Sequence, residues 1–259
     1  MLSAGTTQPT PTETAAEHGQ SALTVALRAG AVTRALLLVG ALLLVCSVAG
    51  QLLERAHPES GVYASVMRAT NAGLEGNLPS LYSAALLLAS ALLVGLLART
   101  ATPRMGIQAR GWRMLTWVFA YLTADEYLHL HELLTAPMRQ LLRVDGVLHY
   151  AWVVPYAALG VVLLAVLAPF LRSLPPRVLG RMLGAAAAYV LGAVGLELLG
   201  GLLDSRLGEA APALLAASTL EEGLEMTGAI LFIGVLLDCL GAARPGTTFT
   251  LAFSGPTST

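Results

Sequence analysis

The sequence predicts an all-α polytopic membrane protein, a six-helix transmembrane bundle with both termini in the cytoplasm. Three observations lead to this prediction. The chain of 259 residues is 56% hydrophobic and only 12% charged, whereas a soluble domain carries roughly 25% charged residues. Its apolar runs reach the ~20 residues that a helix needs to cross the hydrocarbon core. Its Arg residues, finally, are shared unequally between alternate loops.

Six apolar segments supply the predicted helices. Three contain no Asp, Glu or Arg, namely residues 35–53, 77–98 and 146–171. Three more are interrupted by charged residues and cover approximately residues 112–134, 178–203 and 213–240. Together they define a transmembrane domain over residues 31–241. Residues 1–30 are predicted to be a disordered or amphipathic N-terminal segment, with a short surface helix expected at 21–33. Residues 242–259 are predicted to be a flexible C-terminal tail.

The Arg residues indicate how the chain is oriented in the membrane and what kind of organism it comes from. All 15 basic residues are Arg, and with the N-terminus inside, ten fall in cytoplasmic segments and five in outer ones. This bias favours cytoplasmic termini. The formal net charge of −1 offers no basic surface for nucleic acid. A composition rich in Ala, Leu, Gly and Arg without Lys is typical of a GC-rich bacterial genome, so we expect the bacterial inner (plasma) membrane.

The stretch TADEYLHLHELL, at residues 123–134, places ionisable groups at the end of the third apolar segment. In a continuous helix Asp125, Glu126, His129 and Glu132 fall within an arc of about 120°, and His131 points away from them. A charge at membrane depth costs ~2.5–3.5 kcal/mol, so such residues normally serve a function or a partner. Glu132 could also simply reach the headgroup region.

Acidic residues of two later segments are expected at the same outer depth. Glu197 lies in the apolar stretch AVGLELLGG, and the sixth segment contains Glu221, Glu222 and Glu225. Glu221 and Glu222 also suit a helix N-terminus, where the dipole favours acids. His149 lies near the start of the fourth segment. No Arg lies in the predicted spans at this depth, which favours a metal ion or protons as the means of neutralising the acids.

A metal site is the first functional hypothesis. Glu126-x-x-His129 has the spacing of carboxylate-bridged di-iron bundles, in which facing helices supply further Glu ligands. The predicted metal ligands are therefore Glu126, His129, Glu197, Glu222 and Glu225. Residues predicted for the second shell, or as alternative ligands, are Asp125, Glu132, His149 and Glu221. The pattern departs from di-iron proteins because the second motif has Glu in place of His. A single zinc ion held by His129, His149 and a carboxylate is the other arrangement considered.

The expected activity follows from that site. Iron or zinc in the outer half of the bundle would serve an oxidoreductase or a hydrolase acting on a lipid-soluble molecule that enters from the membrane. Membrane lipid is the expected partner. Two alternatives stay open: a proton- or cation-coupled transporter, which uses buried carboxylates, and a structural accessory subunit whose acids hold the helices together.

Four stretches carry a resemblance to other proteins. At DEYLHLHE, AWVVPY, GLELLGG and EEGLEMTGAILF, the chain resembles a group of uncharacterised bacterial multi-pass membrane proteins. In that group a DE…HE helix and an EE-x-x-E helix recur in the same order. The resemblance covers roughly residues 112–240. It implies a bacterial membrane protein and no particular reaction.

Overall fold

The computed structural model describes residues 22–25, 28–100, 106–208, 211–243 and 249–252. The chain divides into two compact units, residues 28–247 and a smaller unit of residues 1–27 and 248–259. In the smaller unit, β1 (Ala22–Val25) pairs antiparallel with β2 (Phe249–Ala252). This strand lies where the sequence analysis expects a short surface helix. Most of the predicted disordered segment and of the predicted flexible tail lies outside the described residues.

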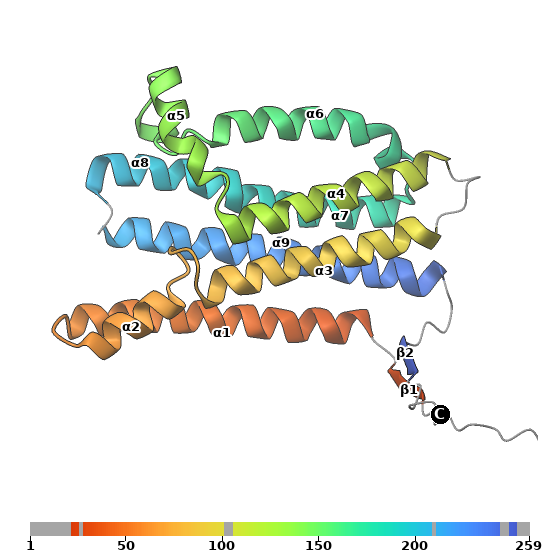
Figure 1. The fold of residues 1–259 in the computed structure, drawn as a ribbon, viewed down its shortest axis with the longest axis horizontal. Helices are drawn as coiled ribbons and strands as arrows, with labels where there is room; N and C mark the ends of the chain where they lie inside the picture. Colours follow the sequence, from red (N-terminus) through yellow and green to blue (C-terminus); the bar gives the residue numbers. More distant parts are fainter. Residues whose placement is uncertain (1–21, 26–27, 101–105, 209–210, 244–248, 253–259) are drawn as a thin grey trace, which may run out of the picture. The chain divides into compact units, whose positions relative to one another are not determined.

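Helices form the whole described part of the larger unit apart from its connecting loops (Figure 1). In chain order they are α1 (Ala29–Ala56), α2 (Gly61–Thr70), α3 (Leu78–Thr100), α4 (Gly106–Leu128), α5 (Glu132–Leu142), the short 3₁₀ turn η2 (Gly146–Leu148), α6 (Val153–Arg172), α7 (Pro176–Val190), the π-helical turn η3 (Leu191–Leu196), α8 (Glu197–Leu207) and α9 (Pro212–Ala243). The long helix α9 packs against α1, α3, α7 and α8. Residues on α9 therefore face several helices at once.

Five helical segments are long and apolar enough to cross a membrane, and this supports the prediction of a membrane protein. They are Ala29–Ala56, Leu78–Thr100, Val153–Arg172, Pro176–Leu207 and Pro212–Gly241. Large apolar side chains point outward from them, such as Leu38 at 71% and Val161 at 69% exposure. A surface of this kind suits lipid rather than water. The helix α4 has 23 residues but contains Arg110, Arg113, Asp125 and Glu126, and it is not among the five.

The third predicted segment is not one helix. Helix α4 ends at Leu128, and His129 adopts a left-handed backbone conformation with φ 54°. The Leu130 N–H then donates to the Asp125 carbonyl, and α5 begins at Glu132. Because a left-handed residue cannot continue a right-handed helix, the predicted helical arc does not extend beyond α4. His129, His131 and Glu132 take their directions from the turn.

Apolar packing fills the half of the bundle in which α4 begins and α9 ends. One buried cluster there includes Trp112, Leu115, Phe170 and Leu236. The Trp112 and Phe170 rings meet edge to face with centroids 5.0 Å apart. The functional side chains described below all lie toward the opposite end of α4 and the first half of α9.

Glycines allow α9 to approach the α7–η3 segment closely. A Cβ atom on Gly228 would lie 2.6 Å from the Tyr189 backbone nitrogen, and one on Gly192 would lie 2.8 Å from the Glu221 carbonyl oxygen. Small residues at such contacts are how membrane helices bring their backbones together. The contact places the first half of α9 directly against η3.

We expect Gly228→Val to destabilise the bundle by about 1–3 kcal/mol, because the added side chain would overpack the α7–α9 contact. The measurement is the thermal unfolding midpoint in detergent. Gly241→Ala is the matched control on the same helix, because a Cβ there meets no atom within 4 Å. An equal loss in both variants would contradict the close contact.

Candidate metal centre

His131 is held at the end of α4 by a network of polar and aromatic side chains. Its Nδ1 lies 3.1 Å from Asp125 Oδ2, and the Tyr156 hydroxyl donates to Asp125 Oδ1 at 2.7 Å. The Trp152 ring lies 4.7 Å from the imidazole, centroid to centroid. The prediction that His131 points away from the acids is therefore wrong. The left-handed turn at His129 returns the chain so that His131 faces Asp125.

Glu75, His131 and Glu132 form a group that could hold a metal ion. Each offers one ligand atom, and these atoms all lie within 4.8 Å of one another. Glu75 belongs to the loop between α2 and α3, and the sequence analysis does not select it. The signal was available: Glu75 is the acidic residue directly before the second apolar segment, on the side where the other acids were expected.

His129 also contacts Glu75. Its Nδ1 is 2.8 Å from Glu75 Oε2, although the angles at this contact do not complete a hydrogen bond. The Ser80 hydroxyl also donates to Glu75 Oε2, at 3.3 Å. Glu75 therefore connects the predicted ligand His129 to the group that contains His131.

Burial and charge act in opposite directions on this group. Partial burial raises the pKa of Glu75 above its ordinary value, while the neighbouring His129 opposes the rise. Burial alone would lower the pKa of His131. The hydrogen bond that His131 donates to Asp125 and the charges of Asp125, Glu75 and Glu197 outweigh this effect, so the pKa of His131 is raised. The network thus favours a charged imidazole when no metal is bound.

Glu197 is the first residue of α8 and follows the π-helical turn η3. The Trp152 indole N–H donates to Glu197 Oε1 at 2.6 Å. The Glu197 carboxyl is also hydrogen-bonded to that of Glu221 on α9. Turns of the π type are frequent at functional sites, where they redirect one side chain within a helix. Here the turn precedes the carboxyl that contacts both Trp152 and α9.

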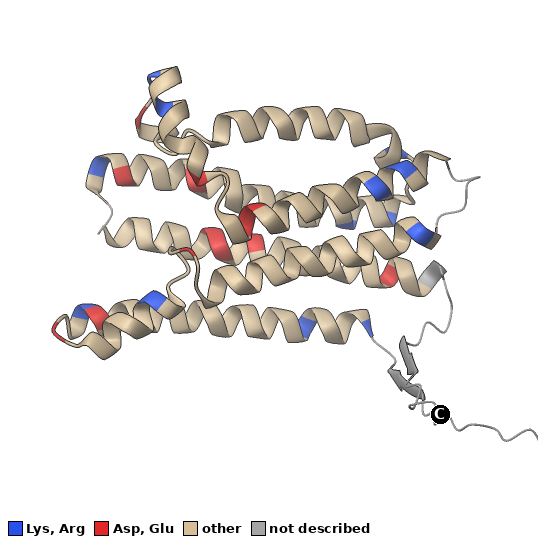
Figure 2. Ribbon diagram, in the orientation of Figure 1, with Lys and Arg blue, Asp and Glu red and all other residues tan. Residues whose placement is uncertain are grey.

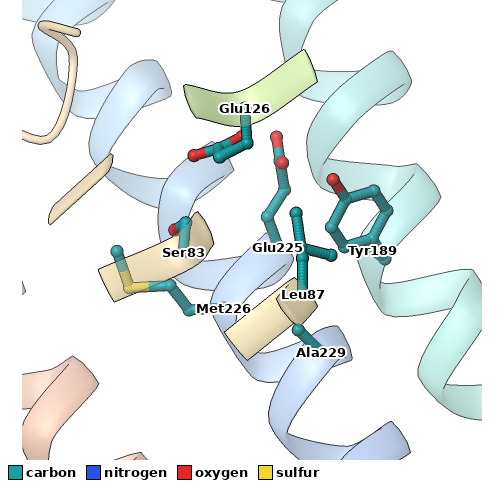
Figure 3. A pocket seen from close by; sticks show the side chains of 7 residues that line it. All are labelled: Ser83, Leu87, Glu126, Tyr189, Glu225, Met226 and Ala229. Atoms are coloured by element: carbon teal, nitrogen blue, oxygen red, sulfur yellow. The ribbon is translucent and has the colours of Figure 1, made fainter. Parts of the chain in front are cut away.

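Glu126 and Glu225 face a narrow gap between α3, α4, α7 and α9 (Figure 3). Ser83, Tyr189 and three apolar side chains complete the lining, and the gap has no room for a water molecule. The Tyr189 hydroxyl is hydrogen-bonded to the Glu225 carboxyl. Glu222, one turn earlier on α9, keeps a buried Oε2 that forms no hydrogen bond.

His149 belongs to a different group of charges. Its Nδ1 lies 2.7 Å from Asp145 Oδ1, and its Nε2 lies 3.5 Å from Asp204 Oδ2. Arg139 also contacts both His149 and Asp145. His149 precedes α6, which begins only at Val153, so it lies in a connecting turn and not in the helix predicted over residues 146–171.

The predicted ligands therefore fall into neighbouring groups and not into one shell. Glu126 and Glu225 share the gap, Glu197 pairs with Glu221, and His129 contacts Glu75. Figure 2 shows acidic residues along the middle of the bundle, with most basic residues at the helix ends. Among the described residues, the three side chains that meet a common metal-binding distance are Glu75, His131 and Glu132.

Comparison with known proteins identifies a family and no activity. The family described as "domain of unknown function (DUF8692)" matches residues 36–240. The match covers all the helices that carry the polar groups described above. No curated protein and no solved structure matches the chain.

We expect Asp125→Asn to lower the pKa of His131 in the metal-free protein, because it removes the charge that stabilises the imidazolium. A raised folded-state pKa means that charged His131 stabilises the fold at low pH, and that this contribution disappears as the pH rises through that pKa. The measurement is an NMR titration of the His131 ring. Asp238→Asn, which breaks the Arg181–Asp238 pair instead, should leave the titration unchanged.

Proposed function

The chain belongs to the DUF8692 family, and we propose that it is a membrane metalloprotein that binds iron or zinc through Glu75, His131 and Glu132. The observation that carries this proposal is the convergence of their ligand atoms within 4.8 Å. Imidazole together with carboxylates suits iron or zinc, whereas calcium prefers oxygen alone. Three protein ligands leave positions open for water or substrate, as in catalytic sites.

Asp125 supports the proposal as the residue that orients the histidine ligand. Because His131 Nδ1 is engaged by Asp125, Nε2 is the nitrogen that is left for a metal. Metal-ligating histidines commonly bind a carboxylate through their second nitrogen, and this contact fixes the ring. The Tyr156 hydroxyl in turn fixes Asp125, and the Tyr121 hydroxyl lies 2.6 Å from that of Tyr156.

The neighbouring acids give the proposed site a means of moving protons. Two carboxyl groups hydrogen-bond each other only when they share a proton, so Glu197 and Glu221 can hold one between them. A bound metal would supply Lewis-acid or redox chemistry at this end of the bundle.

We propose a lipid-soluble substrate, because Tyr121 is 43% exposed on the outward face of α4. Its hydroxyl begins the chain of contacts that leads through Tyr156 and Asp125 to His131. The reaction class is then an oxidation or a hydrolysis.

We favour a site that opens to one side of the membrane over a path that carries ions across it. The apolar cluster around Trp112, Phe170 and Leu236 is closely packed in the other half of the bundle. Buried residues of this cluster come from α3, α4, α6, α7 and α9, which are also the helices that surround or adjoin the acids. A coupled ion would need polar groups through that layer.

The proposed topology has α4 as a sixth span and both termini in the cytoplasm of a bacterial inner membrane. Support comes from the Arg bias of the sequence and from α4, which at 23 residues is long enough to cross. Its polar end would then open to the extracytoplasmic side. The loop that contains Glu75 would lie on the same side.

Reporter fusions test this topology. A fusion after Arg99 is expected to report the cytoplasm and a fusion after Arg139 the outside, because α4 crosses the membrane between them. The measurement is paired reporter activity with one enzyme active only inside and one active only outside. A shared side for the two fusions would exclude α4 as a span.

We expect the wild-type protein purified without chelators to hold iron or zinc near one ion per chain, and His131→Ala to hold little. Loss of a ligand should weaken binding by more than the ~10–100-fold typical of orienting residues. Elemental analysis is the measurement, with His57→Ala as a control in the loop after α1. His129→Ala, measured alongside, decides whether the predicted ligand His129 also binds. Equal metal in wild type and His131→Ala would contradict the site.

A further inference from the structure

We propose that the narrow gap between α3, α4, α7 and α9 binds a second cation, a dehydrated hard cation of the size of Ca²⁺ or Na⁺, through oxygens of Ser83, Glu126, Glu222 and Glu225. Ser83, Glu126 and Glu225 are among the residues that line the gap in Figure 3, and Glu222 lies one turn before Glu225 on α9. No histidine takes part. This site therefore differs in position and in chemistry from the iron or zinc site, and it does not depend on that site.

Ser83 gives the first reason. Its side chain is 6% exposed, it lines the gap, and its Oγ has no hydrogen-bond partner. A helical Ser commonly bonds the carbonyl one turn earlier, as Ser90 on the same helix does to Leu86 O at 3.0 Å. A buried polar atom without a partner is rare and can indicate a bound ion.

Glu222, a neighbour of Ser83, gives a second reason. Its Oε2 is buried and also lacks a partner. It lies close enough to Ser83 to interact, but the two oxygens do not complete a hydrogen bond. An ion between them would satisfy both oxygens at once. The same structure thus leaves two neighbouring oxygens, from α3 and α9, in need of a positive partner.

Charge gives the third reason. Glu126 and Glu225 reach the same gap from α4 and α9, and Tyr189 adds a hydroxyl. In the described part of the chain, the Arg side chains that form ion pairs contact Asp145 and Asp238, outside the gap. Several carboxyl groups in a space without water need protons or a cation.

The donor atoms and the size of the gap select the ion. Oxygen donors alone favour hard cations over iron or zinc. The gap has no room for a water molecule, which disfavours Mg²⁺, because Mg²⁺ keeps several of its waters. Bare Ca²⁺ and Na⁺ are smaller than a water molecule, whereas bare K⁺ is about as large as one. Carboxylates from Glu126, Glu222 and Glu225 favour the higher charge of Ca²⁺.

Such an ion would cross-link side chains of three helices. Ser83 is on α3, Glu126 on α4, and Glu222 and Glu225 on α9. A ligand that binds only the folded state stabilises it in proportion to its concentration. The expected signature is therefore an unfolding midpoint that rises with the ion and saturates.

The test uses the full chain, treated with chelator and kept in choline chloride, with CaCl₂ or NaCl added in separate titrations. We expect the thermal unfolding midpoint to rise by at least about 2–4 °C in one of them. Ser83→Ala and Glu222→Gln should each raise the half-saturating concentration at least about tenfold. Ser90→Ala is the matched control, a buried Ser of α3 whose hydroxyl is already bonded, and it should respond as the wild type does.

Three results would overturn this inference. The first is an unfolding midpoint that neither salt raises. The second is a half-saturating concentration that Ser83→Ala and Glu222→Gln leave unchanged. The third is loss of the response in His131→Ala, which would place the ion at the other site. Retention of the response in His131→Ala supports two separate sites, whether or not that variant has lost iron or zinc.

Discussion

A carboxyl group buried among apolar helices needs a hydrogen-bond donor, a proton or a cation, and the arrangement around α9 answers that need in several ways. Glu197 takes the Trp152 indole N–H and shares a hydrogen bond with Glu221. Glu225 accepts a hydrogen bond from the Tyr189 hydroxyl. Asp125 accepts a hydrogen bond from the Tyr156 hydroxyl and is hydrogen-bonded to His131. The aromatic side chains of Trp and Tyr therefore supply most of the hydrogen bonds to these carboxyl groups, a role that Arg often has in soluble proteins.

The same need explains why the polar groups form layers. His131 and Glu132 lie at the α4–α5 turn and are at least partly exposed, and His131 contacts Asp125, which is buried in the last turn of α4. Glu126 and Glu225 lie deeper, in a gap without room for water. The layer near the turn mixes nitrogen and oxygen donors, and the deeper one has oxygen alone. One bundle can thus present two kinds of cation site, because each depth selects its own donors.

The length of the apolar runs was enough to predict the long apolar helices, but it could not predict the turn at the end of α4. The runs that became α1, α3 and α6 are uncharged or nearly so over a membrane thickness. The sequence LHLHELL continues a helical pattern equally well, and no Gly or Pro marks the left-handed residue His129. Consequently the helical arc placed His131 on the wrong side. Glu75 was missed because its signal is its position just before the second apolar segment, whereas the candidate ligands were selected by their spacing within helices.

The π-helical turn η3 acts as a register shift within one membrane-crossing segment. It accommodates extra chain between Tyr189 and Glu197 relative to an α-helix, so that both side chains meet partners on the α9 side. If residues 191–196 wound as a regular α-helix instead, everything after them would be rotated by about 100°. Glu197 would then leave the Trp152 indole and turn toward another face. The direction of the Glu197 carboxyl therefore depends on the winding of this turn as well as on the residue itself.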